Sequence, residues 1–361
     1  MSSPRFALDD QIAAIPATVR DVLASVQAPA LDPERPVLFS GIGTSLHAAR
    51  VAADWVTQLT GGRTRAHALD AHHLAARVPL TGEEQVVVIS HRGWKRYPTA
   101  ALAKAHAAGC LTVAVVGAAA PEQPAEFTLH TCGNETAGTF SVSYLASLAA
   151  LARVAEGIAT ATAPAAGSAA ATALAAFSAG LARLPADLAA TVAEPAPIEA
   201  ARRLDGREPL LLIGFGVDHP TVEEAALKLK EGSWLWTEGL SVEFALHGTP
   251  AVYRPGQGAV VVLPGEDDGG RTAEALGLLA QLGIETVTLG ATPTTAAPAA
   301  APGLPRADLH FAATDSLLRP FTAIVPFHRL TAELARLRGT DPDTLHGNRD
   351  PWAPAMKAIQ L

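Results

Sequence analysis

Short runs of Val, Ile and Leu alternate with helical stretches, and this alternation limits the possible folds more than any other feature of the chain. Apolar runs occupy residues 37–40, 85–90 and 110–116, with helical periodicity over 46–59 and 99–108 between them. Runs of this kind are buried on both faces, which is typical of parallel strands covered by helices on each side. The sequence therefore predicts an α/β fold built on parallel sheet.

The same order of segments recurs in the second half of the chain. Gly41-Ile42-Gly43 and Gly214-Phe215-Gly216 each follow an apolar run. Two further apolar runs begin at Val86 and Val260. The distance along the chain between these two runs is one residue longer than the distance between Gly41 and Gly214. Two unrelated halves that match by chance are the alternative, but the nearly constant offset favours duplication of one α/β unit.

Composition excludes several classes of protein. Hydrophobic residues make up 49% of the 361 residues and charged residues 17%, which excludes intrinsic disorder and suits two domains. A net charge of -8 excludes nucleic-acid binding through a basic face. The first twenty residues carry Asp9, Asp10 and Pro16 instead of an apolar signal block, and the two cysteines form no disulfide framework. We expect a cytoplasmic protein with no membrane partner.

One uncharged stretch, residues 157–182, is long enough to raise the question of a membrane span. Its large apolar residues Leu174, Phe177 and Leu181 recur at spacings of three and four, which places them on one narrow stripe of a helix. We expect an amphipathic connecting helix there.

Two loops that follow predicted strands have the composition of an anion site. Gly41-Ile42-Gly43-Thr44-Ser45 leads into a helix, and Ser90-His91-Arg92-Gly93-Trp94-Lys95-Arg96 follows the next buried run. Helix N-termini at the carboxyl ends of parallel strands favour anions, because free N–H groups point outward there. Dinucleotide and P-loop motifs are absent, since GIGTSL lacks the third Gly and no GxxxxGK[ST] occurs. A tight turn and a solvated basic turn are the alternative interpretations of these loops.

Three segments carry a resemblance to a known family: GIGTSLHAARVAADWV, VVVISHRG and EEAALKLKEGSWLWTEGLSVEFALHG. They resemble the tandem sugar isomerase (SIS) domains, in particular the isomerase half of glucosamine-6-phosphate synthase and its free-standing relatives. The resemblance covers roughly residues 35–361. It implies two flavodoxin-like parallel sheets, each flanked by helices on both faces. Since the glutaminase half has no counterpart here, we expect no glutamine-driven amination.

The resemblance assigns an anion-binding role to both loops. Gly43, Thr44 and Ser45 match the first family loop, and Ser90 matches the start of the second. His91, Arg92 and Lys95 stand where the family has Gln, Ser and Thr, so cations replace hydroxyls. Arg binds phosphate or sulfonate through a planar fork and Lys as a point charge. A third family loop keeps Glu135 but lacks its lysine, so the sugar pocket differs from that of the synthase.

The resemblance also implies the proton-transfer residues. Glu231 matches the carboxylate that shuttles a proton between C1 and C2, and His247 matches the ring-opening histidine. Lys228 matches a lysine that shares a helix face with Glu231 at i and i+3. The alternative is a charged outer face with Glu224–Lys228 as an ordinary i,i+4 pair. By analogy His247 is presented across a dimer interface, so we expect a homodimer with a shared site.

The C-terminal tail resembles a family segment that closes over the open-chain sugar. Asp341-Pro342-Asp343 fits its Asp-x-Asp start, and Lys357 is the candidate closing lysine, with an exposed terminal lysine as the alternative. The adjacent His72 and His73 lack a convincing third ligand, so we expect no metal, and no cofactor is implied.

The predicted organisation has five parts, namely a helical segment 1–34, a first SIS domain 35–158, an Ala-rich helical connector 159–199, a second SIS domain 200–338 and a tail 339–361. The predicted activity is aldose–ketose isomerisation, through an enediol, of a small sugar with an anionic C6 group, either phosphate or sulfonate. Two alternatives remain open: removal of an amine from a phosphorylated amino sugar or fructosamine, and a sugar-phosphate sensor without catalysis.

Overall fold

The computed structural model describes residues 4–293 and 304–359, and the chain divides into two compact units. The N-terminal unit comprises Ile15–Glu135, Val142–Pro185 and Gly347–Leu361. The C-terminal unit comprises Met1–Ala14, Thr136–Ser141 and Ala186–His346. The finer domain boundaries given above remain predictions.

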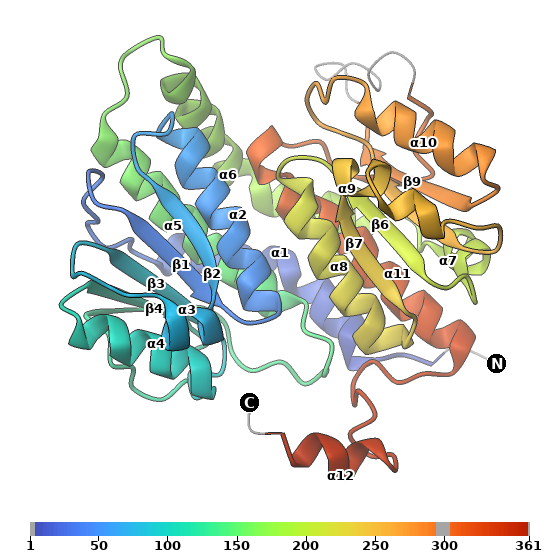
Figure 1. Ribbon diagram of the computed structural model, residues 1–361, viewed down its shortest axis with the longest axis horizontal. Coiled ribbons are helices and arrows are strands. Elements are labelled where there is room, and N and C mark those ends of the chain that lie inside the picture. Colours follow the sequence, from blue (N-terminus) through green and yellow to red (C-terminus); the bar gives the residue numbers. More distant parts are fainter. Residues whose placement is uncertain (1–3, 294–303, 360–361) are drawn as a thin grey trace. The chain divides into compact units, whose positions relative to one another are not determined.

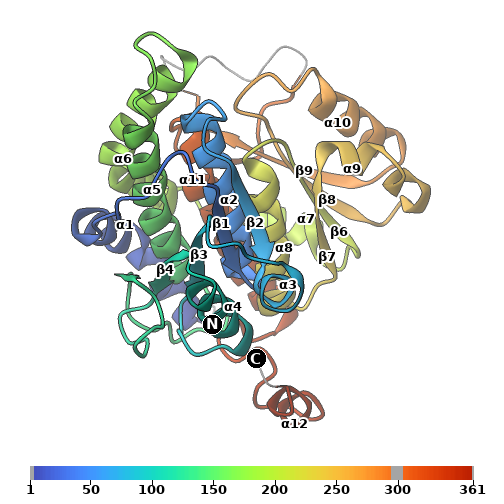
Figure 2. The ribbon, with the colours of Figure 1, turned by 60° about the vertical axis from the view of Figure 1, so that its left-hand side comes forward.

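The N-terminal unit is built on a parallel five-stranded sheet in the order β2-β1-β3-β4-β5. Its strands are β1 (Val37–Gly41), β2 (Ala66–Asp70), β3 (Gln85–Ser90), β4 (Leu111–Val116) and β5 (Phe127–His130). Its helices are α2 (Thr44–Leu59), α3 (Ala71–Arg77), α4 (Arg96–Ala107), α5 (Val142–Thr162) and, in the C-terminal tail, α12 (Trp352–Lys357). Helices α2 and α5 pack together on one face of the sheet, and α3 and α4 pack together on the other (Figure 2).

The C-terminal unit repeats this plan in the order β7-β6-β8-β9-β10, again all parallel. Its strands are β6 (Leu210–Gly214), β7 (Thr237–Ser241), β8 (Gly258–Val262), β9 (Glu285–Ala291) and β10 (Leu309–Phe311). Its helices are α7 (Ile198–Leu204), α8 (Asp218–Ser233), α9 (Val242–Leu246), α10 (Arg271–Gln281) and α11 (Arg319–Arg338), with 3-10 turns η1 (Thr249–Val252) and η2 (Ser316–Leu318). Helices α8 and α11 cover one face and α9 and α10 the other (Figure 1).

The two sheets confirm the duplication and the predicted fold class. In both, the first strand lies between the second and the third, which is the flavodoxin-like order. Val37 of β1 pairs with Gln85 of β3, and Leu210 of β6 pairs with Gly258 of β8. Along the chain, β6 therefore follows β1, and β8 follows β3, by the same number of residues that separates the two Gly-x-Gly turns. The position equivalent to Val86 is Ala259, one residue before the start of the apolar run at Val260. This offset allows β1, the turn after it and β3 to be compared residue by residue with β6, the turn after it and β8.

The central strands are buried over their whole length, as continuous apolar runs require. All residues of β1, β3, β6 and β8 are buried. In the N-terminal unit Leu38, Val86 and Val88 pack against Leu74 and Leu102 of α3 and α4. The equivalent face of the C-terminal unit packs its strand residues against α9 and α10. Burial on both faces follows from helices covering both sides of each sheet.

Two helices, α5 and α6 (Ala169–Ala193), are long and apolar enough to cross a membrane by length and composition alone. In α5, 83% of the most apolar window is buried inside the protein, as in the core helix of an α/β fold. In α6 the share is 22%, and the predicted stripe faces inward: Phe177 and Leu181 are buried and Leu174 is partly buried. Helices α1 (Ala7–Ser25) and α6 each contribute residues to both units.

Candidate active site

In the N-terminal unit the two predicted anion loops follow neighbouring strands at the place where the strand order reverses. Ligands of open α/β sheets bind beyond the carboxyl ends of the strands at this place. The first loop follows β1 and the second follows β3, which pair directly in the sheet. The structure therefore brings both loops to one edge, as a shared anion site requires.

The first loop turns sharply into α2. Gly43 has φ 52° and precedes the helix, and Thr44 and Ser45 form its first turn, partly exposed. A side chain at Gly41 would lie 2.6 Å from the backbone carbon of Ser45, so this position requires glycine. The N–H groups of Ser45 and Leu46 donate within the turn, to the Ile42 and Gly43 carbonyls over 3.1 and 2.8 Å. The positive end of the α2 dipole still favours an anion at this place.

The second loop presents cations from a compact turn. Ser90 is buried at the end of β3, Arg92 is exposed, and Lys95 is the partly exposed residue that precedes α4. The N–H of Gly93 donates to the Ser90 carbonyl over 2.9 Å, which closes the turn. The Arg92 guanidinium lies 6.0 Å from the centre of the exposed Trp94 ring. Two cations and an aromatic ring thus lie on one turn after β3.

His91 differs from its neighbours because its ring is buried. A side chain at Gly117 would come within 2.7 Å of the ring, and the Gly117 N–H donates to the His91 carbonyl over 2.8 Å. Burial lowers the pKa of His91, and the nearby charge of Arg92 lowers it further. The ring is therefore neutral at pH 7, so the loop's charge comes from Arg92, Lys95 and Arg96.

Glu135 contacts the backbone in the N-terminal unit. Its Oε1 accepts a hydrogen bond of 2.6 Å from the N–H of Ser143, in the first turn of α5. A carboxylate in this position stabilises a helix start. The structure thus gives Glu135 a structural contact, and its predicted contact with substrate remains a prediction.

In the C-terminal unit α8 carries the predicted Lys228–Glu231 pair. Lys228 Nζ lies 2.5 Å from Glu231 Oε2 and 3.5 Å from Glu224 Oε1. The Lys228 and Glu224 side chains are 1% and 0% exposed, whereas Glu231 is 25% exposed. The alternative of a charged outer face is wrong, because α11 covers this side of α8. Of the two carboxylates, Glu231 is the one that solvent or a substrate can reach.

His328 on α11 lies next to this cluster and was missed by the sequence analysis. It is fully buried, and neither ring nitrogen has a hydrogen-bond partner within the described residues. Burial lowers the pKa of His328 to about 3; the charge of Glu224 opposes this shift and that of Lys228 adds to it. A neutral imidazole therefore faces the buried Lys228–Glu224 pair.

His247 lies on the other face of the sheet from α8. It ends α9, is exposed, and its N–H donates to the Glu243 carbonyl over 2.8 Å. Since α9 packs with α10 and α8 packs with α11, the structure does not bring His247 to Glu231 within the unit (Figure 1). This placement is compatible with His247 acting on a partner copy, which remains a prediction.

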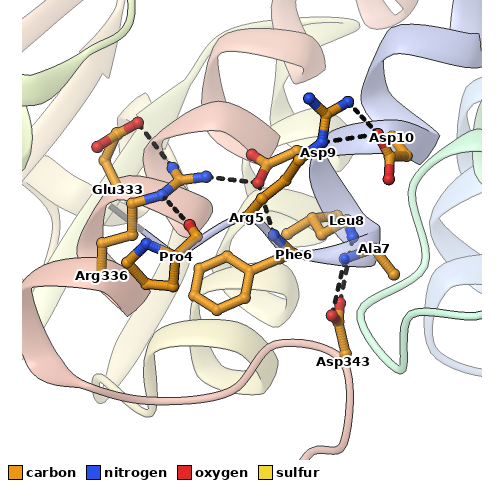
Figure 3. A network of polar contacts seen from close by, with 10 residues as sticks. All are labelled: Pro4, Arg5, Phe6, Ala7, Leu8, Asp9, Asp10, Glu333, Arg336 and Asp343. Atoms are coloured by element: carbon orange, nitrogen blue, oxygen red, sulfur yellow. Dashed lines mark hydrogen bonds and ion pairs between the residues drawn. The ribbon is translucent and has the colours of Figure 1, made fainter. Parts of the chain in front are cut away.

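The tail has a structural contact at its start. The Asp343 carboxylate accepts from the N–H groups of Ala7 and Leu8, over 2.8 and 3.1 Å, and so caps α1 (Figure 3). Arg336 of α11 bridges Glu333 and Asp9 in the same region. Asp343 is thus a helix cap in this structure.

Lys357 ends the short helix α12 and is exposed. Its predicted closing role over the sugar stays a prediction. Among residues 4–293 and 304–359, no group of three or more His, Cys, Asp or Glu side chains is arranged to hold a metal ion.

Comparison with known proteins identifies relatives over most of the chain, although no family model matches it. The glutamine–fructose-6-phosphate aminotransferase (isomerizing) of Thermococcus kodakarensis is 25% identical over 330 residues, 90% of this chain and 53% of that protein. The same enzyme of Aeropyrum pernix is 28% identical over 316 residues, 85% of this chain and 49% of that protein. The chain thus spans about half the length of these relatives.

Solved structures share the fold. The C-terminal domain of glucosamine-fructose-6-phosphate aminotransferase from Francisella tularensis has a TM-score of 0.79 at 18% identity, over 94% of this chain and 98% of that one. Tagatose-6-phosphate ketose/aldose isomerase from Escherichia coli has a TM-score of 0.64 at 17% identity, over 95% and 98%. Glucosamine-6-phosphate deaminase from Thermotoga maritima has a TM-score of 0.67 at 14% identity, over 94% and 97%. The resemblance found in the sequence is confirmed: the chain has the tandem SIS fold and is a homologue of the isomerase half of glutamine–fructose-6-phosphate aminotransferase.

Proposed function

We propose that the protein is an aldose–ketose isomerase that acts on a small sugar with an anionic group, phosphate or sulfonate, at C6. The observation that carries the proposal is the Lys228–Glu231 contact of 2.5 Å on α8, in which the lysine is buried and the carboxylate is partly exposed. A general base must be reachable by the substrate and held in a defined orientation, and this pair meets both needs. The relatives, which are named as isomerizing aminotransferases, support the same assignment.

Glu231 would move the proton. Its carboxylate takes the proton from C2 of the open-chain aldose and returns it to C1, while a proton passes from O2 to O1. The Lys228 ammonium favours the ionised carboxylate before transfer, and positive charge near the enediolate lowers the barrier. His247 opens the sugar ring from a partner copy, so the competent unit would be a homodimer. Lys357 closes over the open-chain sugar.

The anion loops of the N-terminal unit would hold the C6 group. Thr44, Ser45 and the N-terminus of α2 supply hydroxyl and backbone donors, and Arg92 and Lys95 add full positive charges. A sulfonate is a weak hydrogen-bond acceptor with a single charge, so it gains more from cations than from hydroxyls. The cationic second loop therefore keeps a sulfonated sugar beside a phosphorylated one as a candidate.

Two other functions use the same residues in part. A deaminase or deglycase needs the same carbonyl chemistry and releases ammonia or an amine. A sensor needs only the anion loops, and the buried arrangement around Lys228 and Glu231 weighs against it. Proton exchange at C2 in deuterated water separates an enzyme from a sensor, and amine release separates a deaminase from an isomerase.

The test begins with a thermal-shift screen of free, phosphorylated, aminated and sulfonated hexoses, followed by NMR of each hit in deuterated water. Glu231→Gln should keep folding and ligand binding and lose turnover by a factor of roughly 10² to 10⁴, the usual contribution of a general base. Glu238→Gln is the matched control, because it makes the same change at an exposed carboxylate of the same unit. Unchanged turnover in Glu231→Gln would refute the proposal.

A further inference from the structure

A buried ion pair lies at the start of α8, away from Lys228 and Glu231. Arg319 Nε and Nη2 donate to the same oxygen of Asp218, over 2.9 and 2.7 Å, and both side chains are almost fully buried. Nη2 also donates to the Leu263 carbonyl over 2.7 Å, and the guanidinium lies 5.0 Å from the Phe311 ring centre. The other Asp218 oxygen has no hydrogen-bond partner among the described residues. Both N–H groups thus converge on one buried carboxylate oxygen, and such charge-assisted N–H bonds are also the contacts that arginine makes to phosphate and sulfate.

Comparison of the two copies shows which residue of the N-terminal unit corresponds to Asp218. The constant offset between the two copies places Asp218 at the position of Ser45, in the first loop of the proposed anion site. Ser45 stands in the first turn of α2, and Asp218 stands in the first turn of α8. The hydroxyl that we propose as an anion ligand in one copy is thus replaced by a carboxylate in the other.

The backbone of the two loops is the same. Gly43 has φ 52° and Gly216 has φ 56°. A side chain at Gly41 would meet the backbone of Ser45 at 2.6 Å, and one at Gly214 would meet that of Asp218 at 2.7 Å. The hydrogen bonds of the two turns also correspond. The Ser45 N–H donates to the Ile42 carbonyl over 3.1 Å, as the Asp218 N–H does to the Phe215 carbonyl over 3.0 Å. The Leu46 N–H donates to the Gly43 carbonyl over 2.8 Å, as the His219 N–H does to the Gly216 carbonyl over 3.1 Å. The C-terminal unit therefore retains the anion-binding loop as a backbone.

The loop after β8, which corresponds to the second anion loop of the N-terminal unit, indicates where the cation Arg319 lies. Continued beyond β3 and β8 into loops of different length, the offset of the strands places Gly265 of the C-terminal unit opposite Arg92 of the N-terminal unit. A side chain at Gly265 would come within 2.7 Å of Arg319 Cδ and within 2.9 Å of Nε and Nη1. Arg319, from the first turn of α11, thus lies against the position from which Arg92 extends in the other copy. Both partners of an arginine–anion contact are present in the C-terminal unit.

We propose that the C-terminal unit contains a second oxyanion site that its own Asp218 carboxylate occupies, with Arg319 as the cation. The bound anion is part of the chain, so the site takes no external ligand in the native protein. Replacing Asp218 by the Ser of the other copy opens the site to a free tetrahedral oxyanion such as sulfate or phosphate. By the same reasoning we expect Arg92 to be the cation of the site in the N-terminal unit.

The experiment compares the wild-type protein, Asp218→Ser and Asp218→Ser/Arg319→Met. Thermal unfolding is measured against sodium sulfate and against inorganic phosphate, with sodium chloride at equal ionic strength as the reference. We expect Asp218→Ser to unfold at a lower temperature in chloride and to recover several degrees in millimolar sulfate or phosphate. The double variant removes the cation and should show no extra recovery. The loops of the N-terminal unit are common to all three proteins, so their contribution cancels in the comparison.

Calorimetric titration with sulfate should find one more site per chain in Asp218→Ser than in the wild type. An equal response of the single and double variants to sulfate overturns the proposal, as does a response no larger than that of the wild type. If Asp218→Ser does not fold in chloride, the soluble yield after refolding in sulfate is compared with that in chloride, and equal yields overturn it. Anion binding is the readout throughout, so a wrong sugar assignment leaves this result unaffected.

Discussion

Lys228 contacts two carboxylates, those of Glu224 and Glu231. We expect only its contact with Glu224 to contribute strongly to the stability of the C-terminal unit. Glu224 is fully buried and lies 3.5 Å from the Lys228 ammonium, whereas Glu231 is closer, at 2.5 Å, and 25% exposed. At an effective dielectric constant of about 20, a pair at 3.5 Å gains roughly 5 kcal/mol of Coulomb energy, which offsets the cost of desolvating both charges. Replacing Lys228 by Met leaves Glu224 buried without this compensation.

We therefore expect Lys228→Met to lower the free energy of unfolding by about 3–5 kcal/mol, the usual cost of removing one partner of a buried pair. Adding Glu224→Gln should restore at least about 2 kcal/mol, because the buried charge is then gone. Adding Glu231→Gln instead should restore less than about 1 kcal/mol, since a partly exposed carboxylate is hydrated by solvent.

The measurement is equilibrium unfolding in urea at pH 7.5, followed by far-UV circular dichroism, for the wild type, the three single variants and the two double variants. A shift of the midpoint at unchanged slope reports stability and not compactness. The reasoning is refuted if Lys228→Met costs less than about 1 kcal/mol, or if Glu231→Gln rescues it as well as Glu224→Gln does. Either result would mean that distance matters more than burial in this cluster.

Three further predictions concern other residues. Burial lowers the pKa of His328 from 6.5 to about 3, so the neutral ring costs no stability above pH 6.5, and stability falls as the pH drops toward 3, by about 2 kcal/mol at pH 5. His328→Gln should therefore flatten the profile of stability against pH between pH 7 and 5 in urea titrations. Parallel profiles of the wild type and the variant would contradict this. Arg92→Ala should raise KM for an anionic sugar roughly 10- to 100-fold with little change in kcat, while Arg96→Ala, in the same loop, should not; equal KM values would exclude Arg92 from the anion site. Asp343→Ala removes the acceptor for two N–H groups of α1 and should cost about 0.5–2 kcal/mol in urea unfolding, and an unchanged midpoint would show that the cap is dispensable.

The fold could be predicted because its signals are local and repeated. Continuous apolar runs predicted buried parallel strands, and the recurrence of the Gly-x-Gly turns predicted two copies. The contact between Lys228 and Glu231 followed from their spacing of three on a helix. These inferences depend only on residues that are close in the chain or on a fixed offset between copies.

The burial of the charged residues could not be predicted in the same way. The segment around Glu224 and Lys228 has the pattern of a solvated helix face, and only the packing of α11 against α8 turns it into an interior cluster. His328 comes much later in the chain, in an apolar run, with no local pattern that marks it. Asp343 fits a family motif, yet its carboxylate contacts α1, which a motif alone does not reveal.

The position of Asp218 could have been found from the sequence, since the offset from Gly41 to Gly214, applied to Ser45, leads to it directly. The sequence alone does not reveal that Arg319 is the cation that binds Asp218, because Arg319 lies on a different helix, far along the chain. In the C-terminal unit the buried cations Lys228 and Arg319 are both matched by buried carboxylates of the same unit. In the N-terminal unit Arg92 and Lys95 stand instead at the open loop, where solvent reaches them. An external anion can contact only cations that it can reach, so the cations of the N-terminal unit remain open to such an anion, whereas those of the C-terminal unit are matched within the chain.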